Sequence, residues 1–102
     1  MAKTIDHHAW VYVAVQNPGN NETIIGQHDA ENDIHFIPLF KDKDSAMQGI
    51  LHLAKNKGEA LEIQAIIYED LMDYAAKGGF LLFVLDGSGQ ILSKIAPDGQ
   101  PL

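Results

Sequence analysis

The segment from Ile34 to Ala46 constrains the fold most, because an apolar run passes there directly into residues that start a helix. Positions 34–40 are apolar except for His35, and Asp42 and Asp44 follow at once. Aspartate caps a helix start and complements its dipole, so the segment predicts a strand leading straight into a helix. Apolar residues then recur at helical spacing at Met47, Ile50, Leu51 and Ala54. We expect this stripe to pack on a sheet, so that Leu51→Ala costs about 2–5 kcal/mol.

The rest of the chain also alternates between strand and helix patterns. The expected strands cover residues 9–16, 23–28, 34–40, 60–67, 80–85 and 90–95, and the expected helices cover 42–57 and 68–77. Two successive crossovers should place both helices on the same side. The expected fold class is therefore α+β, with a single mixed sheet, two helices packed on one face and the order β-β-β-α-β-α-β-β. We expect one domain over residues 1–102, with loose termini at 1–8 and 96–102.

Composition excludes several classes of function. The 102 residues carry a net charge of -7, the seven basic residues are all lysine, and there is no cysteine. Nucleic-acid binding needs a positive field, so we expect no nucleic-acid partner. Disulfides and thiolate metal sites are impossible without cysteine. No apolar run is long enough to cross a bilayer, and no signal-peptide pattern is present. We therefore expect no membrane association and a cytoplasmic location.

Two histidines flank an acidic loop and are the candidate metal ligands. If residues 23–28 and 34–40 pair as a hairpin, His28 and His35 come close, and Asp33, like Asp29 and Glu31, can add a carboxylate. Zn²⁺ and other divalent metals take such ligands. The spacing matches no defined metal motif, and the simpler interpretation is surface histidines beside an ordinary acidic loop. We therefore expect no tight metal site and no cofactor, and keep a small-ligand or metal-binding domain as the alternative.

The preferred function follows from surplus apolar surface. Residues 80–85 are apolar at every position, and Trp10 and Tyr12 alternate with valines in the first strand. A half-exposed sheet normally has polar residues on its wet face, so this surplus predicts an interface. We expect a non-enzymatic protein-association module, a homodimer with the interface residues Trp10, Tyr12, Leu81 and Phe83. The alternative is that strand 90–95, the tail or the N-terminal arm covers this face.

Three stretches resemble a small bacterial domain family of unknown function that is widespread in cyanobacteria. They are residues 11–19 with 24–26, residues 37–46, and residues 62–66 with 69–71. The sequence Pro38-Leu39-Phe40 is also similar to the amino-terminal domain of SseB-type proteins. The resemblance spans about residues 10 to 85 and implies the fold. Neither family supplies catalytic residues to transfer to this chain.

Overall fold

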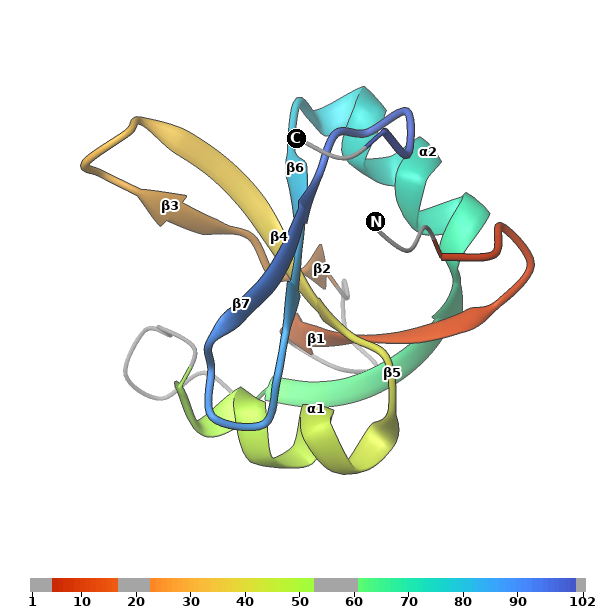
Figure 1. Cartoon of the computed structure of the whole chain (residues 1–102), viewed down its shortest axis with the longest axis vertical. Helices are drawn as coiled ribbons and strands as arrows, with labels where there is room; N and C mark the ends of the chain where they lie inside the picture. The colour runs from red at the N-terminus through yellow and green to blue at the C-terminus, as the bar shows by residue number, and fades with distance from the viewer. Residues whose placement is uncertain (1–4, 17–22, 53–60, 101–102) are drawn as a thin grey trace.

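The computed structural model describes residues 5–16, 23–52 and 61–100 and shows one mixed sheet with two α-helices (Figure 1). The strands are β1 (Trp10–Gln16), β2 (Thr23–Ile24), β3 (Gln27–Asp29), β4 (Ile34–Phe40), β5 (Leu61–Ile67), β6 (Leu81–Leu85) and β7 (Ile91–Ile95). The helices are α1 (Lys43–Gly49), continued by the 3₁₀ turn η1 (Ile50–His52), and α2 (Tyr68–Gly78). The α+β class expected from the sequence is confirmed.

The centre of the sheet is formed by β4, which pairs in parallel with β6 and antiparallel with β1. β5 lines β1 along its whole length, and β7 lies beyond β6. The single strand expected over residues 23–28 is instead two short strands, since β2 pairs with the end of β1 and β3 with the start of β4. Ile25 lies between them, where its N–H donates to the Ala14 carbonyl at 2.9 Å and its side chain is buried.

Pro38 lies within β4, although proline cannot donate a hydrogen bond to a sheet. On one edge of β4, the pairing with β3 ends at Phe36 and the pairing with β1 begins at Leu39. Pro38 therefore falls between two pairing partners, where its missing N–H is tolerated.

The two helices contact opposite faces of the sheet, which corrects the expectation that they share one face. Leu71 of α2 packs in a cluster with Val11 and Ile37, whereas Ala46 of α1 packs with Phe83 on the other face. The reason is the direction of the crossovers. The chain passes from β4 across β1 to β5. It then returns in the opposite direction, across β1 and β4, to β6. Right-handed crossovers that run in opposite directions place their helices on opposite faces.

The buried face of α1 also differs from the expected stripe. Met47 is 55% exposed and Leu51 is 84% exposed, whereas Ala46 and Gly49 are buried. At Gly49 the helix approaches the sheet closely, since a side chain there would meet the ring of Phe40 and the Asp86 carbonyl. Ala54 and the rest of the expected helix lie outside the described residues.

The residues at the helix ends and along α2 explain where the helices begin, end and pack. The Asp42 side chain caps α1 by accepting a hydrogen bond from the Ser45 N–H at 2.7 Å. The buried stripe of α2 consists of Tyr68, Leu71, Met72 and Ala75. Gly79 ends α2 with a φ of 75°, a left-handed conformation that glycine adopts without strain.

The described parts of the termini make backbone contacts. The Glu69 N–H donates to the His7 carbonyl, which attaches the N-terminal segment to the start of α2. Residues 96–100 form a turn closed by a hydrogen bond from the Ala96 N–H to the Gln100 carbonyl.

Candidate functional site

The hairpin of β3 and β4 extends away from both helices (Figure 1), and Asp29 shapes its loop. The Asp29 carboxylate accepts hydrogen bonds from the backbone N–H groups of Glu31 (3.1 Å) and Asn32 (3.4 Å) and from the Asn32 side chain (3.0 Å). The side-chain hydrogen bond from Asn32 is the main cause that lowers the pKa of Asp29 below its ordinary 3.8, against an opposing effect of desolvation. These contacts fix the path of the loop.

Three side chains meet on this hairpin. His28 and His35 are direct cross-strand partners, and their rings stack with centroids 4.4 Å apart. The Asp33 Oδ1 atom lies 3.0 Å from His28 Nε2. Asp33 has a φ of 53°, the left-handed conformation that aspartate adopts more readily than most residues. One nitrogen or oxygen of each side chain lies within 4.8 Å of the others.

The sequence predicted that His28 and His35 come close if their strands pair, and the pairing of β3 with β4 confirms this. Asp33, a carboxylate that the sequence also offered as a candidate ligand, lies beside them. The approach of Asp33 to His28 depends on the backbone conformation at Asp33, which no residue pattern indicates. All three residues are exposed. An exposed ion pair contributes little to the stability of a fold, so a gain in stability from the His28–Asp33 contact does not explain why these three side chains lie together.

The predicted interface residues lie on the α1-side face, which we define as the sheet face that carries Tyr12, Phe36, Phe40, Phe83 and Leu85. Trp10 precedes Tyr12 by two residues in β1 and therefore lies on the same face, where it is 59% exposed. Tyr12 and Leu81 are half-buried. Phe83 is only 1% exposed, since the Phe36 ring stacks on it at 4.2 Å and the Lys94 ammonium lies 5.3 Å from its centroid.

Further exposed apolar residues occur where α1 meets the turn between β6 and β7. This turn lies across α1 (Figure 1), with Gly89 beside His52. The exposed apolar side chains at this end are Met47, Leu51, Ile91 and Leu92. Helical spacing predicted that Met47 and Leu51 lie in the core, so their exposure was not expected from the sequence. His52 is also exposed.

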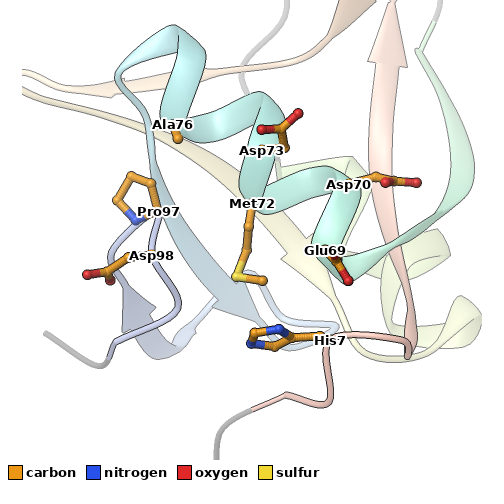
Figure 2. A pocket seen from close by; sticks show the side chains of 8 residues that line it. All are labelled: His7, Glu69, Asp70, Met72, Asp73, Ala76, Pro97 and Asp98. Atoms are coloured by element: carbon orange, nitrogen blue, oxygen red, sulfur yellow. The ribbon is translucent and has the colours of Figure 1, made fainter.

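An acidic depression of about 570 Å³ lies between α2, the N-terminal segment and the C-terminal turn (Figure 2). Its lining residues are His7, Glu69, Asp70, Met72, Asp73, Ala76, Pro97 and Asp98. Figure 2 shows Met72 pointing from α2 towards His7. Asp73 forms an ion pair with Lys77 at 3.1 Å. The four carboxylates are exposed, and acidic side chains are ordinarily found on a protein surface, so we assign no ligand to this depression.

No protein-family model matches the chain, and comparison with curated proteins and with solved structures found no match. The resemblance to the cyanobacterial family and to SseB-type domains therefore stays an expectation. Within the described ranges, no helix is long and apolar enough to cross a membrane.

Proposed function

We propose that this chain is a non-enzymatic module that associates with a second copy of itself through the α1-side face. The observation that carries the proposal is the exposure of Trp10 on a sheet face, beside the half-buried Tyr12. Large aromatic residues are enriched at protein interfaces, and two-fold dimers are the commonest oligomers.

The distribution of charge favours the α1-side face over the other. β5 pairs with β1 and presents only uncharged residues on this face: Leu61, Ile63, Ala65 and Ile67. On the opposite face the same strand presents Glu62. Because the chain carries a net charge of -7, two copies meet with least repulsion where acidic residues are missing.

The non-enzymatic part of the proposal is supported by the exposure of the ionisable groups. Among the residues that the structure describes, no carboxylate, histidine or lysine side chain is buried. The buried ionisable side chain is Tyr68, whose pKa is raised by burial, and it lies in the apolar core rather than in a cavity. Acid–base catalysis depends on groups whose pKa is shifted, and burial is a main cause of such shifts. The proposal also includes a cytoplasmic location, since small secreted domains are usually rich in disulfides and this chain has no cysteine.

Light scattering at micromolar concentration tests the association. We expect twice the 11.2 kDa chain mass for the natural sequence and a shift towards the monomer for Trp10→Gln. Tyr74→Gln is the matched control, because Tyr74 is an exposed aromatic residue on α2, on the other side of the sheet. A monomer at this concentration, or equal dissociation in both variants, would show that the α1-side face is not a dimer interface.

A further inference from the structure

We propose that the β3–β4 hairpin binds one divalent transition-metal ion, such as Zn²⁺, through His28, Asp33 and His35. The proposal is independent of self-association, because the hairpin extends away from the body of the sheet (Figure 1). It rests on the geometry of the three side chains and on their chemistry.

The distances suit a metal ion after small side-chain rotations. Zinc binds histidine nitrogen and carboxylate oxygen at about 2.0–2.2 Å, so two ligand atoms of a tetrahedral site lie about 3.3 Å apart. His28 Nε2 and Asp33 Oδ1 are already 3.0 Å apart, and the ligand atoms of all three residues lie within 4.8 Å of one another. The backbone can therefore stay as it is, since the cross-strand pairing already holds His28 opposite His35.

The second histidine distinguishes a metal site from a simple ion pair. The contact between His28 and Asp33 needs no further group. His35 has its ring stacked on His28, with an interplanar angle of 22°, and this brings a second imidazole nitrogen close to the His28–Asp33 contact. Neutral imidazoles are metal ligands, and a metal ion uses both rings together with the carboxylate.

The donor atoms indicate which metals would bind. Two imidazole nitrogens and one carboxylate oxygen suit Zn²⁺, Co²⁺, Ni²⁺ and Cu²⁺, whereas Mg²⁺ and Ca²⁺ prefer sites made of oxygen atoms alone. Three protein ligands leave at least one position for water. Because all three residues are exposed, we expect a dissociation constant in the micromolar range or weaker, which agrees with the expectation of no tight site.

Isothermal titration of the full chain with Zn²⁺ tests the proposal. We expect one ion per chain, and an affinity that falls by at least about tenfold in His28→Ala and in His35→Ala, because loss of an outer-shell partner alone costs about 10–100-fold. His52→Ala is the matched control, since it removes an exposed histidine that lies outside the cluster. Titration with Mg²⁺ should give no saturable heat.

Asp33→Asn provides a second variant that keeps the fold. Asparagine tolerates the left-handed backbone at this position, so circular dichroism should match that of the natural chain. We expect weaker Zn²⁺ binding and, with Co²⁺ as the probe, a changed visible absorption spectrum. The absence of saturable Zn²⁺ binding would overturn the proposal, as would binding that is weakened by His52→Ala but unchanged in the cluster variants.

Discussion

Gly49 has no side chain, and this lets α1 lie directly on the sheet. A methyl group at this position would fall on the ring of Phe40 and lie 3.2 Å from the Asp86 carbonyl oxygen. We expect Gly49→Ala to lower the free energy of unfolding by about 1–3 kcal/mol, although alanine favours a helix by about 1 kcal/mol. Denaturant unfolding measures this change. Gln48→Ala, one residue earlier on the exposed side of α1, should have no comparable effect, and a stabilised Gly49→Ala variant would contradict the close approach.

Asp29 makes the hairpin loop sensitive to acid. The hydrogen bond from Asn32 holds the pKa of Asp29 in the folded chain below 3.8, its ordinary value. Ionised Asp29 therefore stabilises the loop fully above pH 3.8, and this stabilisation is lost as the pH falls below 3.8 through the folded pKa. Hydrogen exchange of the Asn32 amide should accelerate in that range, after correction for the intrinsic pH dependence. Asp29→Asn cannot titrate and should abolish the acid step; an unchanged step in this variant would assign it to another group.

At the scale of elements, the two helices bury different proportions of their apolar residues. Leu71 in α2 is fully buried, so Leu71→Ala should cost about 2–5 kcal/mol. Leu51 in η1 is 84% exposed, so Leu51→Ala should change stability by less than about 0.5 kcal/mol, in contrast to the sequence expectation. Denaturant unfolding of both variants gives the comparison directly. An equal loss of unfolding free energy in the two variants would show that Leu51 is buried in the core.

Local chemistry explains which elements could be predicted. The cap at Asp42, the left-handed end at Gly79 and the turn at Asp86 each depend on residues close in sequence, and the sequence predicted the cap at Asp42. The face that each helix covers depends on the order of the strands. No residue pattern reveals that β5 pairs with β1, so the reversal of the second crossover could not be predicted.

The same limit applies to the candidate sites. Pairing of β3 with β4 follows from two strand patterns around a loop, which is why the approach of His28 to His35 was predictable. The Asp33 contact and the burial of Phe83 depend on one backbone angle and on packing by Phe36. The spacing of residues in the sequence indicates neither the Asp33 contact nor the burial of Phe83.

At the scale of the whole molecule, the net charge of -7 opposes self-association. Raising the ionic strength from about 0.01 M to about 0.15 M shortens the screening length from about 30 Å to about 8 Å. If the dimer forms through the α1-side face, where β5 presents no charged residue, its fraction should rise with salt, as measured by light scattering at fixed protein concentration. A dimer that dissociates on adding salt would instead indicate an interface made of ion pairs.

The pairing of β1 with β5 has a consequence for the order of folding. Trp10 pairs with Ile67, so this part of the sheet forms only after a long stretch of chain has been brought together. The hairpins β3–β4 and β6–β7 close short loops and form at lower entropic cost. Trp10 is the single tryptophan of the chain, and it lies in β1 opposite Ile67, the last residue of β5. Its fluorescence therefore follows the late closure of the sheet rather than the early hairpins.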